Sequence, residues 1–599
     1  MTTHVVATAG HVDHGKSTLV RALTGMEPDR WAEERRRGLT IDLGFAWTTL
    51  PSGCDVAFVD VPGHERFLGN MLAGLGPVPV VLFVVAADEG WSRQSSDHRD
   101  AVAALGIRHG LVVVTRADRA PERVAETADQ ARAELEGTGL RDAPVVAVSA
   151  VQGTGMDQLR AALDELLADL PVPDAGGRLR LWVDRSFTVG GAGTVVTGTL
   201  VGGTLSAGDR LQLVGHGQHP REVLVRGLQC RGEARDTVPP TDRVAVNLRG
   251  MPAEEIGRGD ALVVRGTWPV AGVVDVRRTA GVPLDDAPAE LTVHVGTGAV
   301  PARLRVFDAD HARLTLDWPL PLVVGDRLLL RDPGGRRVLG GVRALDVDPP
   351  QLRRRGDGTR RGVALAAMPA EGDVLAKVAQ DGATEEAHLR RTGLVVGDAV
   401  APPDVRVVGG WWVHQPAFAA WRDRLRSLVE REHERDRLMT GVSQGAARAA
   451  LGRPAGRFLD QLVVDAGLEQ AGGQIRLPGA RDDLGPAEDG VAELEARLEG
   501  APFRAPEADE LEAFGLGIRE LAAAERRGRV LRLPGGVVLL PSAPALAMRE
   551  LAGLPQPFTT SEARQALGTS RRVAIPLLEH LDGRGWTRRV DDGHREVVR

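Results

Sequence analysis

Residues Gly10 to Ser17 match the pattern G-x-x-x-x-G-K-[ST] of loops that bind nucleotide phosphates. An apolar segment precedes the loop and a helical one follows it, so backbone N–H groups from Asp13 to Ser17 would cradle phosphates at a helix N-terminus. Lys16 would reach the β- and γ-phosphates, and Ser17 would ligate Mg²⁺. Lys16 and Lys377 are the only lysines of the chain, which indicates that the loop needs a compact ammonium. The alternative is a glycine-rich turn with an exposed lysine.

A second motif, Asp60-Val61-Pro62-Gly63-His64, follows an apolar strand pattern. Asp60 can hold the Mg²⁺ shell from a strand end, and Gly63 lets the backbone approach the γ-phosphate. His64 could orient an attacking water, although a histidine taken alone is more often an ordinary polar surface residue. Thr40 lies between the two motifs and could ligate Mg²⁺ while the γ-phosphate is present, as in the order–disorder switch of GTPases.

The choice of base is indicated by Thr115-Arg116-Ala117-Asp118. The Asp118 carboxylate can accept from N1–H and the 2-amino group of guanine, and adenine has neither donor there. Ser149-Ala150-Val151 would bring a backbone amide to the guanine oxygen. Separately these segments could be plain strand-to-loop turns, but their order after the first two motifs indicates GTP or GDP. The predicted nucleotide-binding residues are Asp13, His14, Gly15, Lys16, Ser17, Thr18, Gly63, Thr115, Arg116, Asp118, Ser149, Ala150 and Val151, and the predicted metal ligands are Ser17, Thr40 and Asp60.

The elements that must position these residues follow an alternating pattern. Short apolar strands at Val5–Ala7, Val56–Val59, Val80–Val85, Leu111–Val114 and Val145–Val148 alternate with helical stretches such as Glu122–Glu136 and Met156–Leu170. This order predicts a parallel sheet covered by helices. Short strands broken by Gly-Asp and Pro-Gly turns then predict two β-barrels, and helices closed by small hairpins predict winged-helix units. The fold class is therefore multidomain: an α/β P-loop GTPase domain at 1–173, β-barrels at 178–268 and 270–350, and an α+β winged-helix tandem at 355–412, 413–480, 485–545 and 546–599.

Bulk properties restrict the class further. A chain of 599 residues is too long for one hydrophobic core, and its 43% hydrophobic and 26% charged residues fit a globular protein. No apolar run reaches the length of a membrane span, so no membrane partner is expected. The two cysteines, Cys54 and Cys230, favour neither a disulfide framework nor a cysteine-rich zinc site. The cytoplasm is the expected compartment, and a monomer is the expected state. The net charge of −7 does not favour nucleic-acid binding by the whole chain, so local charge must carry that role.

The motifs resemble those of the translational GTPases related to elongation factor Tu, on the strength of Ala9–Thr18, Asp60–Phe67 and Gly193–Gly198. Within that group the chain is most similar to the selenocysteine-specific elongation factors. Three features favour this branch: the stretch Arg37–Ala46, the threonine that opens the base motif, and the long extension beyond the third domain. The segment Thr569–Glu579 also resembles their last winged helix. Arg116 departs from the usual lysine of the base motif, but an arginine can also pack on guanine, and Leu39 in place of the usual isoleucine is neutral.

The resemblance implies a GTPase, stimulated by the ribosome, that delivers selenocysteinyl-tRNA at a recoded UGA codon while its C-terminal arm binds an mRNA hairpin. In the second domain Asp184 could bind the α-amino group and Arg185 the selenolate, with Arg249 as a second cation. The alternative is a surface ion pair on a barrel strand.

The arm offers arginines for RNA. Arg571 and Arg572 would open a recognition helix that ends near His580, and Arg588 and Arg589 would lie on a wing. Alternatively, an arginine-rich protein simply uses these side chains on solvated faces. Two other functions stay open: a general translational GTPase, and a nucleic-acid-binding regulator whose GTPase half only senses nucleotide.

Overall fold

The computed structural model describes residues 3–28, 40–171, 174–216, 219–334, 337–435, 441–479 and 484–598. The residues Arg37 to Leu39 of the quoted stretch lie outside them, as do the predicted domain limits at 1, 173, 480 and 599. The chain divides into two compact units. The first comprises 1–377, 384–402 and 409–412, and the second comprises 378–383, 403–408 and 413–599. Within the described part of the chain, every helix is too short or too polar to cross a membrane.

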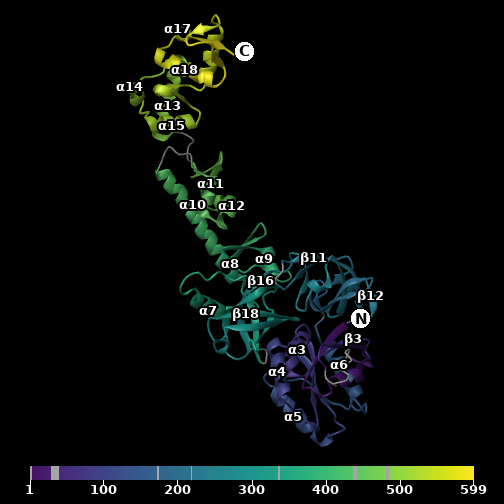
Figure 1. Ribbon diagram of the computed structural model, residues 1–599. Coiled ribbons are helices and arrows are strands. Elements are labelled where there is room, and N and C mark those ends of the chain that lie inside the picture. Colours follow the sequence, from purple (N-terminus) through teal and green to yellow (C-terminus); the bar gives the residue numbers. More distant parts are fainter. Residues whose placement is uncertain are drawn as a thin grey trace. The chain divides into compact units, whose positions relative to one another are not determined.

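A six-stranded sheet forms the centre of the N-terminal domain, drawn in purple and blue in Figure 1. Its order is β2-β3-β1-β4-β5-β6, and all neighbours are parallel except β2 with β3. The strands are β1 (Thr3–Ala9), β2 (Gly44–Thr49), β3 (Asp55–Asp60), β4 (Val80–Ala86), β5 (His109–Thr115) and β6 (Val145–Ala147). Because parallel strands end at the same edge, the loops after β1, β3, β5 and β6 meet there, which is where ligands bind in such sheets.

Helices cover both faces of this sheet because its strands are apolar on both sides. On one face Val81, Phe83 and Val85 of β4 pack with α3 (Leu68–Leu75), α4 (Arg93–Leu105) and α5 (Val124–Leu135). On the other face the alternate residues Val80, Leu82 and Val84 pack with α1 (Lys16–Thr24) and α6 (Met156–Ala168). The sheet is thereby held rigidly between two helical layers, with the loops that carry the motifs at its edge.

Two closed β-barrels follow, drawn in teal in Figure 1. The second domain closes because β10 pairs with both β11 and β15. Its strands are β7 (Arg180–Val189), β8 (Gly193–Gly202), β9 (Leu205–Ser206), β10 (Arg210–Val214), β11 (Arg221–Cys230), β12 (Glu233–Arg235), β13 (Thr237–Val238), β14 (Arg243–Arg249) and β15 (Ala261–Val264). The third domain is a closed barrel of β16 (Val270–Gly281), β17 (Glu290–Val295), β18 (Gly298–Val306), β19 (His311–Pro321), β20 (Arg327–Arg331) and β21 (Val338–Asp346).

The rest of the chain alternates helices with short strands, in teal-green to yellow in Figure 1. The first group is α7 (Asp357–Ala367), α8 (Val374–Asp381), β22 (Ala383–Glu385), α9 (Glu386–Thr392), β23 (Val405–Val408) and β24 (Trp411–His414). The second is α10 (Gln415–Arg435), β25 (Val442–Ser443), α11 (Gln444–Leu451), α12 (Leu459–Asp465), β26 (Glu469–Ala471) and β27 (Gln474–Arg476). The predicted boundaries between winged helices stay predictions, and β24 runs across the one at 412.

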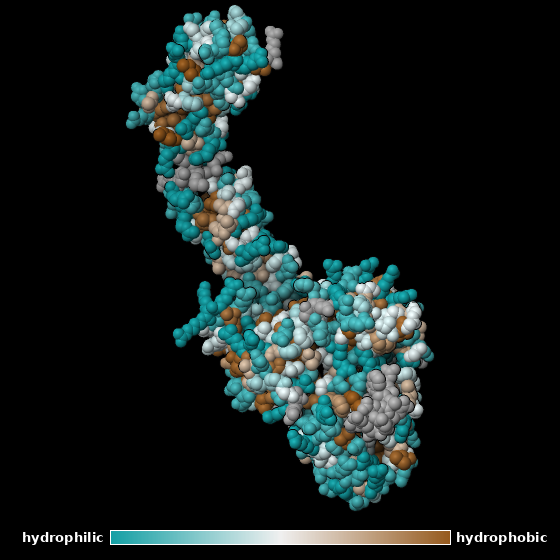
Figure 2. Space-filling view, in the orientation of Figure 1, coloured by the Kyte–Doolittle hydropathy of each residue, from teal (hydrophilic) through white to brown (hydrophobic). Residues whose placement is uncertain are grey.

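The last two groups share one hydrophobic core that runs from Leu484 to Leu581. They comprise α13 (Glu488–Gly500), α14 (Ala508–Ala513), α15 (Ile518–Arg526), β28 (Leu531–Leu533) and β29 (Val537–Leu539), then α16 (Ala543–Ala552), β30 (Phe558–Thr559), α17 (Thr560–Ala566), α18 (Arg571–Gly583), β31 (Thr587–Arg589) and β32 (His594–Val597). On the face drawn in Figure 2, hydrophobic residues form small groups among hydrophilic ones. The predicted fold class of a P-loop domain, two barrels and a winged-helix region is confirmed.

Candidate active site

The loop between β1 and α1 has the backbone of a phosphate cradle. Asp13 and Gly15 have positive φ values of 65° and 82°, which turn successive N–H groups toward the start of α1. A Cβ added at Gly10 would lie 2.1 Å from the Val84 carbonyl oxygen, so only glycine fits against β4 there. The cradle is therefore built from backbone geometry as well as from side chains, which suits an anionic ligand.

Lys16 lies at the centre of this cradle and is only 5% exposed. Its Nζ donates to the carbonyl oxygens of Gly10 at 3.0 Å and His11 at 2.7 Å. A Cβ added at Gly63 would approach Lys16 Nζ and the Val12 nitrogen, each to 2.5 Å. The loop after β3 thus packs directly on the phosphate loop, and glycine at position 63 is required for that approach.

A cavity of about 540 Å³ opens beside this loop. Most of the predicted nucleotide-binding residues line it: Asp13, Gly15, Lys16, Ser17, Thr18, Gly63, Thr115, Arg116, Asp118, Ala150 and Val151. Thr40, predicted as a metal ligand, lines it too, as do the unpredicted Arg21, Glu27 and Arg119. Four predicted residues are not part of the lining: His14, Ser149, Asp60 and His64. The structure therefore brings the phosphate and base motifs around one space.

Two hydroxyl oxygens suited to a hard cation lie together in the lining of the cavity, and the third predicted ligand, Asp60, is buried outside the lining. The Ser17 and Thr40 hydroxyls are 3.0 Å apart. Asp60 is fully buried, and its Oδ1 accepts from the Thr8 hydroxyl at 2.7 Å. The same Thr8 oxygen accepts from the Val61 N–H at 3.1 Å, which orients the carboxylate. Hydroxyl and carboxylate oxygens are the donor set that Mg²⁺ prefers, so these residues fit the ion.

The base side of the cavity is fixed to the phosphate side by hydrogen bonds. The Thr115 hydroxyl donates to the His14 carbonyl oxygen at 2.7 Å. Arg116 donates to the Asp13 carbonyl oxygen and to Glu89 Oε1, the latter at 2.7 Å. Burial opposes the charge of Arg116, but hydrogen bonds to Glu89 and Asp88 outweigh it and raise its pKa. Asp118 is exposed at the cavity, where its carboxylate is available to a base.

Ser149 has a structural place behind the cavity. It is buried, and its hydroxyl accepts from the Gln152 N–H at 3.2 Å. This bond shapes the turn that presents Ala150 and Val151 to the cavity. The contribution of this segment to a base is therefore made by the two residues after the serine.

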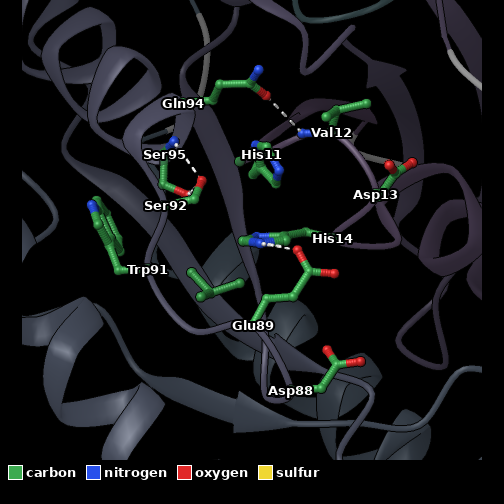
Figure 3. Close-up of polar contacts among 12 residues, drawn as sticks. His11, Val12, Asp13, His14, Asp88, Glu89, Trp91, Ser92, Gln94 and Ser95 are labelled. Carbon is green, nitrogen blue, oxygen red and sulfur yellow. Dashed lines mark hydrogen bonds and ion pairs between the residues drawn. The ribbon is translucent and has the colours of Figure 1, made fainter.

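The side chain of His14 lies beneath the backbone of the phosphate loop, as Figure 3 shows. It is fully buried, its Nδ1 lies 3.3 Å from the Val84 carbonyl oxygen, and its Nε2 lies 3.6 Å from Glu89 Oε2. Burial, together with the neighbouring His11, lowers the pKa of His14 to about 4. The ring is therefore neutral at physiological pH and supports the loop from behind.

His98 of α4 is a site residue that the sequence analysis missed. It is buried, and its Nδ1 accepts from the Gly10 N–H at 3.1 Å. A hydrogen bond with the Gly63 backbone favours the protonated ring, but burial and the nearby Lys16 charge hold the pKa of His98 well below its usual value. Neutral His98 thus links the phosphate loop to the loop after β3. No motif surrounds it in the sequence, so only the fold could reveal it.

His64 lies at the start of a short helix, η1 (Glu65–Phe67), immediately after the loop that carries Gly63. Its Nδ1 accepts from the Arg66 N–H at 3.2 Å and caps that helix. Its ring centroid lies 6.1 Å from that of Phe67. Because Nδ1 is engaged in the cap, Nε2 is the atom that can meet a water.

A charged cluster lies on the second domain where the sequence places the amino-acid site. Asp184 is 4% exposed and forms an ion pair with Arg243, with Nη2 2.9 Å from Oδ1. The Thr197 hydroxyl also donates to this carboxylate. The guanidinium of Arg243 lies 3.4 Å from the Phe45 ring centroid. Arg243 was not predicted, although it lies only a few residues before Arg249.

The two predicted arginines of this site have different surroundings. Arg185 lies 5.0 Å from the same Phe45 ring and donates to Asp42 Oδ2 at 3.1 Å. Arg249, at the end of β14, is exposed. The structure therefore brings Arg185 and the unpredicted Arg243 to one aromatic ring, with Asp184 bound to Arg243, and the role of Arg249 stays a prediction.

Helix α18 of the arm begins at Arg571, as predicted, and continues to Gly583. Arg571, Arg588 and Arg589 are exposed on α18 and β31. Arg572 instead donates to the carbonyl oxygens of Ala505 and Pro506, at 3.2 and 2.9 Å. Three of the four predicted RNA-binding arginines thus face solvent, while Arg572 ties α18 to the preceding winged helix.

The motif order and the P-loop domain followed by two barrels define a translational GTPase, and comparisons with known proteins agree. The family model of the elongation factor Tu GTP binding domain matches residues 1–169. The model of the selenocysteine-specific elongation factor beta-barrel domain matches residues 273–351, and that of the elongation factor SelB winged helix matches residues 549–595.

Full-length relatives narrow the class to one family. The selenocysteine-specific elongation factors of Desulfomicrobium baculatum and Escherichia coli (strain K12) are each 32% identical to this chain, over 98% of both chains. A crystal structure of a bacterial selenocysteine-specific elongation factor, EF-Sec, matches over 100% of both chains with a TM-score of 0.73 and 25% identity. The chain belongs to the selenocysteine-specific elongation factor family, and the predicted resemblance is confirmed.

Proposed function

We propose that this GTPase binds GTP with Mg²⁺, carries selenocysteinyl-tRNA to the ribosome at a recoded UGA codon, and holds an mRNA hairpin with its C-terminal winged helices. The single observation that carries the substrate assignment is the pair Arg185 and Arg243 at the Phe45 ring, with Asp184 bound to Arg243. A selenol is a stronger acid than a thiol, so the amino acid arrives largely as an anion. Two guanidinium groups beside a carboxylate offer charge to both the selenolate and the α-amino group.

Mg²⁺ would be held by Ser17, Thr40 and Asp60. When bound, the ion neutralises charge on the β- and γ-phosphate oxygens. Thr40 lies on the segment just before β2, so its hydroxyl can report whether the triphosphate is present. Asp60 is held in orientation by Thr8, and Lys16 supplies the compact charge that completes the cradle.

Protection of the aminoacyl ester tests the substrate assignment. The rate of ester hydrolysis of selenocysteinyl-tRNA is measured with the full-length protein loaded with GTP or with GDP, and seryl-tRNA is the control. We expect protection of selenocysteinyl-tRNA in the GTP form alone. Equal protection of seryl-tRNA would favour a general translational GTPase, and no protection of either tRNA would favour a nucleotide-sensing regulator.

Replacing Arg185 with alanine should weaken selenocysteinyl-tRNA binding to the GTP form by about 10- to 100-fold, the loss of one hydrogen bond to a charged group. Seryl-tRNA carries no anionic side chain, so its binding should change far less. The test measures the affinities of both tRNAs for the GTP forms of the Arg185→Ala and wild-type proteins. The Arg210→Ala protein is the matched control, since Arg210 lies on β10 of the same barrel, is 75% exposed and pairs with Glu222, outside the predicted pocket. Equal losses for the two tRNAs would refute the role of Arg185.

The arm should bind its hairpin mainly through phosphate contacts. Arg588 and Arg589 are 72% and 59% exposed, and they form surface ion pairs with Glu596 and Glu579, which phosphate groups can replace. Replacing both with alanine should weaken binding of the messenger hairpin and lower the slope of log affinity against log salt by about 1 to 2. The control is Arg549→Ala, which removes an exposed arginine of α16 outside the predicted set. An unchanged salt slope in the double variant would contradict the assignment.

A further inference from the structure

Asp42 occupies an unusual place between the nucleotide site and the second domain. It lies two positions after Thr40, in the segment that leads into β2. Its two carboxylate oxygens bind two arginines of the second domain: Oδ1 accepts from Arg258 at 2.7 Å and Oδ2 from Arg185 at 3.1 Å. Two guanidinium groups of the second domain therefore hold this one carboxylate through charge-assisted hydrogen bonds.

The same arginines connect Asp42 to two other parts of the site. Arg258 also donates to Asn70 Oδ1 at 2.7 Å and to the Asp184 carbonyl oxygen at 3.1 Å. Asn70 lies on α3, just beyond the loop with Gly63 and His64, and its Nδ2 donates to the Ile41 carbonyl oxygen at 2.8 Å. We call Asp42, Asn70, Arg185 and Arg258 the Asp42 clamp. It joins the Thr40 segment, the helix after His64 and the strand with Asp184 in one closed network.

We propose that Asp42 is a positioning residue that makes selenocysteinyl-tRNA binding depend on the nucleotide, because it orients Arg185 when the Thr40 segment is closed on Ser17. This inference rests on the proposed function of the Arg185 cluster and names how that site is regulated. In the structure the Thr40 hydroxyl lies 3.0 Å from the Ser17 hydroxyl, and Asp42 accepts a hydrogen bond from Arg185. Only Ile41 separates Thr40 from Asp42, so Thr40 cannot move far from Ser17 without moving Asp42.

The contacts of the Asp42 clamp indicate that Asp42 orients Arg185 and does not compete with the selenolate for it. Arg185 approaches the Phe45 ring while Nη2, a single nitrogen, meets both Asp42 and the Leu43 carbonyl oxygen. A guanidinium carries five N–H donors, so the remaining donors can serve a selenolate. A partner carboxylate at one edge fixes the plane of the group, which lowers the entropy lost when a second anion binds. If the Thr40 segment moves away from Ser17, the contact between Asp42 and Arg185 is lost. The Arg185 side chain then has no carboxylate that fixes its orientation.

The test compares Asp42→Asn with a matched variant, Asp55→Asn. Asp55 of β3 also forms an ion pair between the first and second domains, with Arg231, but it is not part of the Asp42 clamp. Affinity for selenocysteinyl-tRNA is measured for the GTP and GDP forms of the full-length wild-type protein and of both variants. We expect Asp42→Asn to reduce the ratio of GTP-form to GDP-form affinity by about tenfold, the loss of one charge-assisted contact. Asp55→Asn should leave the ratio unchanged.

Thermodynamic linkage supplies a second measurement, the effect of selenocysteinyl-tRNA on nucleotide affinity. A substitution that only weakened the fold would not change this effect. If the two sites are coupled, selenocysteinyl-tRNA must tighten GTP binding relative to GDP binding by the same factor by which GTP, relative to GDP, tightens tRNA binding. In Asp42→Asn this tightening should shrink in parallel, while GDP affinity in the absence of tRNA stays at the wild-type value. An unchanged ratio, an equal loss in both nucleotide forms, or the same loss in Asp55→Asn would each overturn the inference. Failure of the wild-type GTP form to bind selenocysteinyl-tRNA would instead refute the proposed function.

Discussion

Replacing Lys16 with arginine should weaken GTP binding by at least about 100-fold, even though the charge is kept. Charge-assisted hydrogen bonds are worth about 1.5–3 kcal/mol each, and Lys16 is placed to make them to two phosphate groups. On the side of Gly10, His11 and Gly63, the structure leaves little room for a larger head group. Lys16 Nζ lies between two carbonyl oxygens of its own loop, and the Gly63 backbone packs so closely that even a Cβ there would come within 2.5 Å. A planar guanidinium would displace the loop after β3.

The chain supplies its own control, because it contains one other lysine. Lys377 is also buried, and its Nζ donates to the Asp348 carbonyl oxygen at 3.0 Å, but Asp348 is 57% exposed and can yield to a longer side chain. Lys377→Arg should therefore leave the affinity for GTP within about twofold of wild type, as remote substitutions usually do. Equilibrium titration with a fluorescent GTP analogue measures both variants. Wild-type affinity in Lys16→Arg would show that the ammonium is replaceable and would contradict the compositional argument.

Many elements of the fold were predictable from hydrophobic patterns in the sequence. The strand patterns at Val56–Val59 and Leu111–Val114 lie within β3 and β5, and the helical stretch Met156–Leu170 contains α6. These elements are buried on both faces or amphipathic, so their hydrophobic periodicity is strong. Strand β2 was not among the predicted strands. It lies at the sheet edge, and its alternating burial leaves Trp47 and Thr49 exposed, which makes its apolar pattern weak.

The site was predictable where a motif fixes the backbone, and not where the tertiary structure joins distant segments. Gly15, Lys16 and Asp118 were found because the spacing of each motif carries its chemistry. His98 was missed because its partners, Gly10 and Gly63, lie 88 and 35 positions away along the chain. Arg243 was missed for the same reason, since strand pairing sets it beside Asp184 while the sequence offers several equivalent arginines. Side chains that act between elements need the register of those elements, which no local pattern contains.

His64→Asn should lower ribosome-stimulated GTP hydrolysis by about 1,000-fold, within the range that positioned acid–base groups contribute. His64 Nδ1 caps η1 by accepting from the Arg66 N–H, so Nε2 is the atom that can orient water. Asparagine is a good helix cap, and its side-chain oxygen can accept the same N–H. It lacks an atom at the position of Nε2. The variant therefore removes the proposed chemistry and keeps the local fold, which alanine would not do.

Single-turnover hydrolysis of GTP by the full-length protein on ribosomes, with selenocysteinyl-tRNA bound, measures this effect. The affinities for GTP and for selenocysteinyl-tRNA should stay within about twofold of wild type, because the residue is not part of the cavity lining and the loss falls on the hydrolysis step alone. His64→Ala should be as slow and less stable, since it also removes the cap, which is worth about 1 kcal/mol. Rapid hydrolysis by His64→Asn, together with slow hydrolysis by His64→Ala, would show that His64 acts as the cap of η1, and that another group orients the water.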